Sequence, residues 1–482
     1  MDRKRRKYAH TRIYSARLNE TARAIDMALH KARIPGRDRK GFIDWTIERL
    51  WSTYKEERMN ERVIIENEIR QLGIRLPNGT VKKDYSFTFA LPVEKIGNIR
   101  LEGAEELGLE FTVTPEGICT LSGKPTKAGD YQLRLSYATV DGEPRSELDV
   151  PVAFNPNPRD LWKNIPTDNN IVYYKQDSAT EYVKVECAPD GSPAKDIVAA
   201  SQRGRSHAQE GKARDDHFSL YHCTDSDWYI IAVADGAGSA KYSRKGSQLA
   251  CETVTDYCRK MLLDNPDFEK AIEEYALERD NREKQANVTG MVISLLRAGA
   301  INAYEKIRAA AEANEDARIR DFSTTLMFAI CKKYDFGWFI ATFWVGDGAM
   351  CLLDKENRTA KLLGTPDEGE YSGQTRFLTM KEVLQDPELA SKRMRFTIVP
   401  DFTALFLMTD GVSDPMFETD RNLKDYSRWE EFYEKLRKGF PEDEIGGVDL
   451  SDDNAMAKDQ LLRWLDFWSP GNHDDRTIAI LY

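Results

Sequence analysis

The chain has 482 residues, of which 41% are hydrophobic and 31% are charged, ordinary values for a soluble protein with room for two to four domains. No run of eighteen apolar residues occurs, and the basic start MDRKRRKYAH is not followed by an apolar segment, so we expect neither a membrane span nor a secretory signal. The seven cysteines form no C-x-x-C pair, which favours reduced thiols and a cytoplasmic protein over a disulfide framework.

Charge is distributed unevenly. The net charge is −11, but residues 1–40 hold 13 Lys and Arg against 4 Asp and Glu, a balance of +9 that leaves −20 for the rest. A basic arm of this kind can bind nucleic acid, an acidic partner or a membrane surface, or form a solvated tail that docks on the acidic remainder. The acidic body argues against nucleic acid as the main substrate.

The first predicted element is a basic helical segment over residues 1–73. Its apolar residues recur at steps of three and four, which gives the helix one apolar face. They are Phe42, Ile43, Ile47, Leu50, Trp51 and Tyr54. Gly73 ends the pattern, and the turn residues of 77–79 begin a different one.

Residues 77–155 alternate apolar and polar side chains and carry turn residues every ten or so positions, which predicts a small antiparallel sandwich. The stretch GICTLSGKPTKAGDYQLRLSY (117–137) resembles the signature of bacterial Ig-like modules. This resemblance implies an all-β Ig-like sandwich that binds proteins or acts as a spacer. From FNPNPRD (154–160) onward we predict a linker over 156–190, followed by a larger domain over 191–482.

Acidic residues recur at strand ends in this larger domain. Three apolar strands end in Asp-Gly, at Asp235, Asp347 and Asp410, although a single Asp-Gly is commonly a hairpin turn and Asp347-Gly348 fits one. Two further acidic sites, NHDDRTIAILY (472–482) and ARDDHFSLY (213–221), directly precede strand-like residues. If these strands pack together, their carboxylates converge and need a compensating cation.

Carboxylates are hard oxygen donors that suit Mg²⁺ or Mn²⁺. A pair of such ions can bind a phosphate ester and activate a water for attack on phosphorus. Nucleotide-binding alternatives fail on spacing. Gly236-Ala-Gly238 lacks the third glycine of G-x-G-x-x-G, because Lys241 stands there, and the chain has neither a P-loop nor a G-x-S-x-G elbow.

The order of these motifs resembles that of the metal-dependent type-2C (PPM) Ser/Thr protein phosphatases, in their bacterial form. The resemblance spans roughly residues 195–482. The motifs that carry it are GRSHAQEGKARDDHF (204–218), VADGAGSA (233–240), FSTTLMFAI (322–330), VGDGA (345–349), MTDGVSD (408–414) and HDDRT (473–477). It implies an α+β domain, with a β-sandwich of two antiparallel sheets flanked by helices and a dimetal site at one end.

The resemblance also assigns roles to single residues. Asp235 would bridge two Mg²⁺ or Mn²⁺ ions, and the carbonyl of Gly236 would bind one of them. Asp410 and Asp474 would hold the other ion. Asp215 would be a water-mediated ligand with Asp216 beside it, whereas Asp414 and Asp347 would line a third, weaker site.

Two positions depart from the family pattern. The family's phosphate-binding Arg, four residues before the first acidic ligand, is replaced by Gly211. The replacement is left open among four basic residues, namely Arg203, Arg205, Lys212 and Arg214. The His that follows the central Asp-Gly in eukaryotic members is Ala237 here. His207 is a candidate for a catalytic or phosphate-binding role, or else it stabilises a local turn.

The resemblance implies a metal-dependent phosphatase that hydrolyses phosphoserine and phosphothreonine in proteins. A phosphorylated protein would be its substrate, and a cognate Ser/Thr kinase a further partner. Two alternatives remain. One is a phosphatase-like signalling scaffold or sensor with weak or no catalysis, which the loss of the phosphate-binding Arg favours. The other is a phosphatase for a small phosphoester or a nucleotide.

Overall fold

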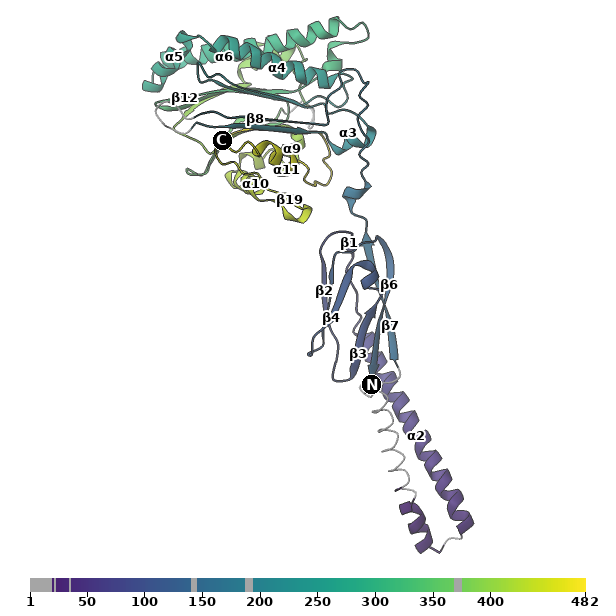
Figure 1. Cartoon of the computed structure of the whole chain (residues 1–482). Coiled ribbons are helices and arrows are strands. Elements are labelled where there is room, and N and C mark those ends of the chain that lie inside the picture. The colour runs from purple at the N-terminus through teal and green to yellow at the C-terminus, as the bar shows by residue number, and fades with distance from the viewer. Residues whose placement is uncertain (1–19, 21–22, 34–35, 140–144, 187–193, 368–374) are drawn as a thin grey trace. The chain divides into compact units, whose positions relative to one another are not determined.

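In the computed structural model, the described residues are 20, 23–33, 36–139, 145–186, 194–367 and 375–482. They belong to two compact units, Met1–Leu161 and Trp162–Tyr482 (Figure 1). Each unit has its own sheets and its own hydrophobic core. The protein is therefore a multidomain α+β chain. The most basic part of the predicted N-terminal segment, residues 1–19, lies outside the described residues.

The first unit combines one long helix, α2 (Gly36–Gln71), with two small sheets. The four-stranded sheet has the order β1 (Gly79–Thr80), β7 (Arg145–Asn155), β6 (Gly129–Thr139), β3 (Ile96–Glu102), and the three-stranded sheet has the order β2 (Tyr85–Ala90), β5 (Ile118–Gly123), β4 (Leu109–Val113). Leu121 and Leu135 from the two sheets share one core with Ile65 and Ile69 of the helix. The last turns of α2 thus pack on the strands.

The earlier part of α2 presents its apolar side chains to solvent. The predicted apolar face lies on this helix, and Phe42, Leu50 and Trp51 are each about half exposed. Stacking of Trp51 on Tyr54 covers part of these rings, at a centroid distance of 5.6 Å.

The second unit is built on two sheets in which every paired strand is antiparallel. The five-stranded sheet has the order β10 (His217–His222), β11 (Tyr229–Ala234), β12 (Leu326–Tyr334), β13 (Gly337–Val345), β16 (Met394–Val399). The six-stranded sheet has the order β15 (Thr359–Gly364), β14 (Ala349–Asp354), β17 (Ala404–Met408), β20 (Arg476–Leu481), β9 (Ile197–Gln202), β8 (Ser178–Val183). A two-stranded ribbon joins β18 (Gly439–Phe440) to β19 (Ile445–Gly446).

Helices cover the outer face of each sheet (Figure 1). Against the five-stranded sheet pack α4 (Ser243–Leu262), α5 (Pro266–Leu277), α6 (Arg282–Glu312), α7 (Glu382–Gln385) and α8 (Pro387–Ser391). Against the six-stranded sheet pack α9 (Asp410–Phe417), α10 (Tyr426–Lys438) and α11 (Ala457–Trp464). The short helix α3 (Arg205–Glu210) follows β9. Short 3-10 turns occur at Glu105–Leu107, Pro158–Leu161, Ile319–Phe322, Asn422–Lys424 and Pro441–Asp443.

This layering explains why the central strands are apolar throughout. Side chains of a strand alternate between its two faces. In β11, Ile230 and Ala232 face the helix layer, whereas Ile231 and Val233 face the other sheet. Both faces are dry, so the strand reads as a continuous apolar run and its first polar side chain is Asp235, where the strand ends.

The structure differs from two interpretations of the sequence. The hairpin considered at Asp347-Gly348 does not form, because β13 pairs with β12 and β16, whereas β14 pairs with β15 and β17 in the other sheet. Asp347 therefore stands where the chain crosses between sheets. Residues 178–183, assigned from sequence to a linker, form the edge strand β8.

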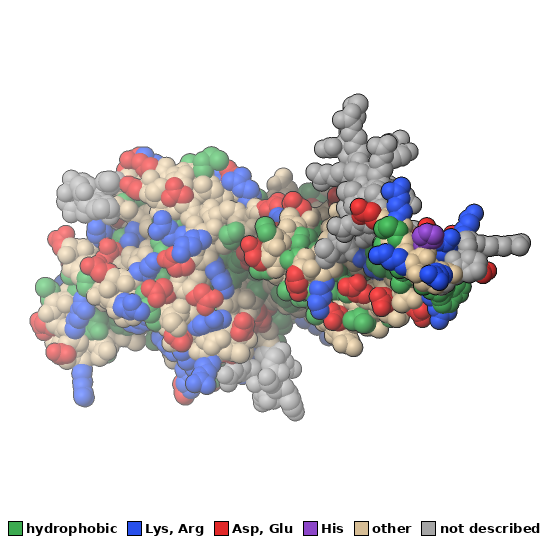
Figure 2. Space-filling model, turned by 90° about the horizontal axis from the view of Figure 1, so that it is seen from below, with side chains coloured by type: hydrophobic (Ala, Val, Ile, Leu, Met, Phe, Trp, Pro, Cys, Tyr) green, Lys and Arg blue, Asp and Glu red, His purple; other side chains and the backbone are tan. Residues whose placement is uncertain are grey.

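Charged side chains of both signs are interspersed on the face of the Trp162–Tyr482 unit that Figure 2 shows. Among the described helices, none has the length and apolar character needed to cross a bilayer.

The core of the second unit gives a test of its packing. Phe406 is fully buried and contacts Trp429 and Phe432 at centroid distances of 6.0 and 5.3 Å. Phe406→Ala should lower the free energy of unfolding by about 3–5 kcal/mol, since it removes aromatic contacts and leaves a cavity. Urea unfolding followed by tryptophan fluorescence measures this. Leu277→Ala, at a side chain 83% exposed, is the control and should change stability by less than about 0.5 kcal/mol. Equal losses would contradict the layered core.

Candidate metal centre

The acidic residues singled out from the sequence meet at one edge of the sandwich. In an antiparallel pair, the end of one strand lies beside the start of its neighbour. Ala234 of β11 pairs with His217 of β10, which brings Asp235 beside Asp216. Met408 of β17 pairs with Ile478 of β20, which brings the segments around Asp410 and Asp474 together.

Three carboxylates are in closest proximity. One oxygen from each of Asp235, Asp347 and Asp410 lies within 4.8 Å of the other two. Burial, together with Asp410 and Asp216, holds the pKa of Asp235 well above its usual range. Burial, together with Asp347 and Asp474, does the same to the pKa of Asp410. Such crowding disfavours the ionised forms unless a cation is bound.

The backbone of Asp235 is fixed by the strand that begins in the FSTTLMFAI motif. Its N–H donates to the hydroxyl of Thr325 at 2.8 Å. Its carbonyl accepts the N–H of Thr325 at 2.8 Å and the hydroxyl of Thr324 at 2.7 Å. Both threonines are buried. The carboxylate is thus held by a rigid backbone rather than by a mobile loop.

Gly236 allows a close approach that no larger residue permits. A Cβ at this position would lie 2.7 Å from the carbonyl oxygen of Asp215 and 3.0 Å from the carbonyl carbon of Ser243. Gly411 behaves in the same way, since its Cβ would lie 1.9 Å from the carbonyl oxygen of Asp475. Small residues after Asp235 and Asp410 therefore let the acidic loops interlock.

Asp216 lies beneath this cluster and is fully buried. Its Oδ2 accepts the hydroxyls of Thr409 at 2.9 Å and Thr477 at 2.7 Å. Its Oδ1 is buried and has no hydrogen-bond partner among the described residues. Burial, with the charge of Asp475, raises the pKa of Asp216 to about 7.

Asp215, beside it, is also buried, and its Oδ1 accepts the Nε of Arg244 at 3.2 Å. Burial and Asp475 raise the pKa of Asp215, although His207 and Arg244 oppose the shift. The backbone of this acidic pair is supported from below by Lys175, whose ammonium donates to the carbonyls of Asp216 at 2.9 Å and Asp215 at 3.4 Å. Burial lowers the pKa of Lys175 to about 7.

Asp475 is the structural centre of the neighbouring loops. Its carboxylate accepts the N–H of Gly204 at 2.6 Å, the N–H of Asp215 at 2.5 Å and the Nδ1 of His207 at 3.1 Å. These bonds lower the pKa of Asp475, although burial alone would raise it. Burial lowers the pKa of His207, but the hydrogen bond and charge of Asp475, with the charges of Asp215 and Asp474, outweigh it and raise this pKa to about 9. His207 is buried, and its Nε2 lies 3.8 Å from Asp215.

The remaining predicted ligands lie around this centre. Asp474 precedes Asp475, and its charge raises the pKa values of Asp235 and Asp410. Asp414 lies one turn after Asp410 on α9 and is exposed. Asp347 accepts the hydroxyl of Thr375 through Oδ2, and its Oδ1 is buried without a partner among the described residues.

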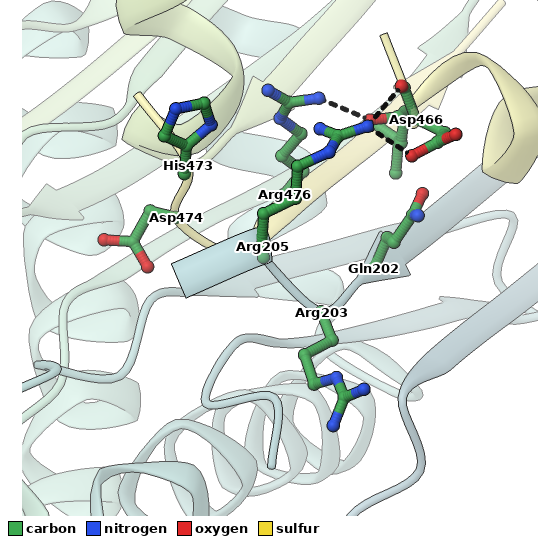
Figure 3. A pocket seen from close by; sticks show the side chains of 9 residues that line it. Gln202, Arg203, Arg205, Asp466, His473, Asp474 and Arg476 are labelled. Carbon is green, nitrogen blue, oxygen red and sulfur yellow. Dashed lines mark hydrogen bonds and ion pairs between the residues drawn. The ribbon is translucent and has the colours of Figure 1, made fainter. Parts of the chain in front are cut away.

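The four basic residues considered for phosphate binding have other contacts. Arg203 is buried and binds Asn164, Asp177 and three further oxygens of its surroundings. Arg205 binds Asp466 at 2.6 Å, and both residues line a pocket together with Asp474 (Figure 3). Lys212 pairs with Glu210 at 2.6 Å. Arg214 is 2% exposed and donates to the carbonyl of Gln176.

Sequence reasoning missed three residues of this site. Asp475 was hidden because it stands beside a predicted ligand and shows no separate pattern. Lys175 lies in the segment assigned to a linker, and Arg244 lies on a helix of which one face forms core. No local signal reveals the last two, because their partners lie 40 and 29 residues away in the chain.

The donor set fits hard divalent cations. It consists of carboxylate oxygens, which are ligands that Mg²⁺ and Mn²⁺ prefer. Two buried carboxylate oxygens, on Asp216 and Asp347, lack protein partners among the described residues. The carboxylates of Asp235, Asp347 and Asp410 are within reach of a shared ion.

Comparison with protein-family models matches residues 203–466 to protein phosphatase 2C, and the chain belongs to this family. A search of curated proteins finds no match. Among solved structures, the catalytic domain of the serine/threonine protein phosphatase PstP in complex with two manganese ions is 17% identical, with 63% of this chain and 98% of that chain covered and a TM-score of 0.36. PstP/Ppp of Mycobacterium tuberculosis is 16% identical, with 60% and 98% covered and a TM-score of 0.32. A C. elegans sex determining protein is 15% identical, with 60% and 65% covered and a TM-score of 0.36.

The contacts of Asp475 give a test of this architecture. Asp475→Ala should lower the free energy of unfolding by about 3–5 kcal/mol, because it leaves a buried imidazole and two buried N–H groups without their acceptor. Urea unfolding of the metal-free protein measures the loss. The matched control is Asp466→Ala, which removes a carboxylate that is 51% exposed and bound to Arg205; it should cost no more than about 1 kcal/mol. Similar losses in the two variants would refute the central role of Asp475.

Proposed function

We propose that the protein is a Mg²⁺- or Mn²⁺-dependent phosphatase that hydrolyses phosphoserine and phosphothreonine in proteins. The observation that carries the proposal is the convergence of Asp235, Asp347 and Asp410 at one edge of the sandwich, with oxygens within 4.8 Å of one another, in a chain of the protein phosphatase 2C family. The raised pKa values of Asp235 and Asp410 support it, since these carboxylates are crowded in a way that cation binding relieves.

The ligand assignment is the one that the family resemblance implies, and the convergence of Asp235, Asp347 and Asp410 supports it. Asp235 would be shared by two cations, with the carbonyl of Gly236 on one and Asp410 and Asp474 on the other. Asp215 would act through a water, and Asp347 with Asp414 would serve a third, weaker site. Bound in this way, a pair of divalent cations supplies an activated water for in-line attack on phosphorus and offsets the charge that develops on the phosphoryl oxygens.

The chain's own residues orient the reaction. Threonine hydroxyls fix one oxygen of Asp216 and leave Oδ1 for a water or a proton. His207 stays a predicted catalytic residue, and its contacts support a role exerted through Asp475 and Asp215. Ala237 has no side chain that can transfer a proton, so that position contributes no general acid.

The rest of the chain would select or position the substrate. We assign the first unit, with its Ig-like sandwich and α2, to protein interaction or spacing. A phosphorylated protein is the proposed substrate, a Ser/Thr kinase the enzyme that produces it, and the cytoplasm the proposed location.

One observation favours a second candidate, a signalling scaffold that binds a phosphorylated partner with little turnover. Gly211 occupies the family position of the phosphate-binding Arg and has φ +69° as the C-cap of α3. This left-handed conformation suits glycine and strains other residues. The backbone here is thus shaped for a residue without a side chain.

Turnover separates these candidates. The wild type should hydrolyse a phosphothreonine peptide and p-nitrophenyl phosphate with Mn²⁺ and lose this activity in EDTA. Asp235→Asn and Asp410→Asn should each lower kcat/KM by at least about 100-fold, because each removes a charged ligand of the ions. The control is Asp280→Asn, at an exposed residue in the turn before α6. A wild type that binds Mn²⁺ by calorimetry but has no turnover would support the scaffold, and hydrolysis of nucleotides alone would support a small-molecule phosphatase.

Metal-free stability provides an independent prediction. Asp410→Asn removes one of the crowded carboxylates, so the metal-free variant should be more stable than wild type by about 1–2 kcal/mol. Mn²⁺ should raise the Tm of wild type and have a smaller effect on the variant. Differential scanning calorimetry with and without Mn²⁺ measures both. A destabilised metal-free variant would show that these carboxylates are not in electrostatic conflict.

A further inference from the structure

Phosphate recognition in this site lacks an obvious cationic residue. A phosphate monoester dianion is bound most strongly by charged, forked donors such as a guanidinium. The family position for this residue holds Gly211, whose φ of +69° places a backbone turn there. The following inference rests on the proposed function and concerns how the same site holds the phosphoryl group.

The four basic residues that the sequence suggested for phosphate binding have other contacts. Arg203 is buried and surrounded by oxygen acceptors. Arg205 binds Asp466 and points away from Asp474 (Figure 3). Arg214 is 2% exposed and donates its Nε to the carbonyl of Gln176, whereas its Nη1 is buried without a partner among the described residues. Lys212 is half exposed and paired with Glu210. Each of these four cations is therefore either buried or paired with a carboxylate.

Arg244 lies against the acidic loop. It is the second residue of α4, and its side chain is 14% exposed. Its Nε donates to Oδ1 of Asp215 at 3.2 Å, and its Nη1 donates to the carbonyl of Val172 at 3.1 Å. Its Nη2 has no hydrogen-bond partner among the described residues. Two anchors therefore fix the guanidinium plane and leave one donor edge.

The backbone that carries Arg244 is packed against the candidate ligands. The carbonyl carbon of Ser243 lies 3.0 Å from the place where a Cβ of Gly236 would stand, and the carbonyl oxygen of Asp215 lies 2.7 Å from the same place. Arg244 is therefore the next residue after Ser243, whose backbone packs against Gly236, the proposed carbonyl ligand. Its side chain then returns to Asp215, the proposed water-mediated ligand.

We propose that Arg244 is the phosphate-binding cation of this protein and that it donates its Nη2 edge to a phosphoryl oxygen of the substrate while Asp215 and Val172 orient it. A fixed guanidinium loses little conformational freedom on binding and matches the geometry of phosphate. Arg244, on α4, would thereby supply the donor that is missing at Gly211.

The test combines kinetics with phosphate binding. Arg244→Ala should raise KM for a phosphothreonine peptide and Ki for inorganic phosphate by about 10- to 100-fold, the range expected for the loss of a charged hydrogen bond. Arg244→Lys keeps the charge without the fork and should recover part of this loss. Mn²⁺ affinity, measured by calorimetry, should change far less than Ki. Circular dichroism verifies that each variant is folded.

Arg259→Ala is the matched control. It removes the same charge from the same helix, about 22 Å further along the axis, where Arg259 pairs with Asp256. It should leave KM and Ki unchanged.

Three outcomes would overturn the inference. The first is an Arg244→Ala variant with the KM and Ki of wild type. The second is a loss in Arg244→Ala that saturating Mn²⁺ restores in full, which would show that Arg244 only supports Asp215. The third is a wild type with no affinity for inorganic phosphate in the Mn²⁺-loaded form. Failure of the proposed function has a separate signature, since a wild type without turnover that binds phosphate through Arg244 would refute the enzyme and keep the inference.

Discussion

Crowding of carboxylates at one edge of the sandwich is the constraint on which the rest of this site depends. Asp235, Asp347 and Asp410 approach one another within 4.8 Å, with Asp216 buried beside them. Their mutual repulsion opposes folding, so the surrounding structure has to hold them in place. Paired strands, threonine hydroxyls and interlocked glycines do so through the backbone, which leaves the carboxylate oxygens available for ligands.

A second layer of contacts supports the first. Asp475 joins α3, the acidic loop and the approach to β20 through three hydrogen bonds. Lys175 holds the carbonyls of Asp215 and Asp216 from the other side. Neither residue belongs to the group of converging carboxylates, yet both determine where the acidic loop lies. Geometry at the centre is therefore set by residues from distant parts of the chain.

The sequence predicted the parts of this arrangement that local patterns encode. Apolar runs that end in Asp-Gly identified β11, β13 and β17, and their terminal acids lie together as expected from strand pairing. The interpretation failed where the outcome depends on which strands pair. Asp347-Gly348 has the composition of a hairpin, but its flanking strands join different sheets. Residues 178–183 read as linker because an edge strand needs little apolar sequence.

Local sequence patterns could not identify the residues that act through long-range contacts. Lys175 and Arg244 have no periodicity or motif that distinguishes them from other surface cations, and only the folded chain shows that both reach the acidic loop. The sequence named His207 as a candidate, but it gave no sign of the hydrogen bond between His207 and Asp475, which lies 268 residues away in the chain.

Because β8 and β20 belong to the six-stranded sheet, the boundaries of a recombinant fragment decide whether this sheet stays intact. The segment that matches the family, residues 203–466, excludes β8, β9 and β20. A recombinant fragment with those boundaries would lack Lys175 and Asp474. It would also expose unpaired N–H and C=O groups along β17, which invites association between chains. A fragment that starts at Trp162 and runs to Tyr482 matches the compact second unit and keeps the sheet intact, so it is the piece to express for crystals of this unit alone.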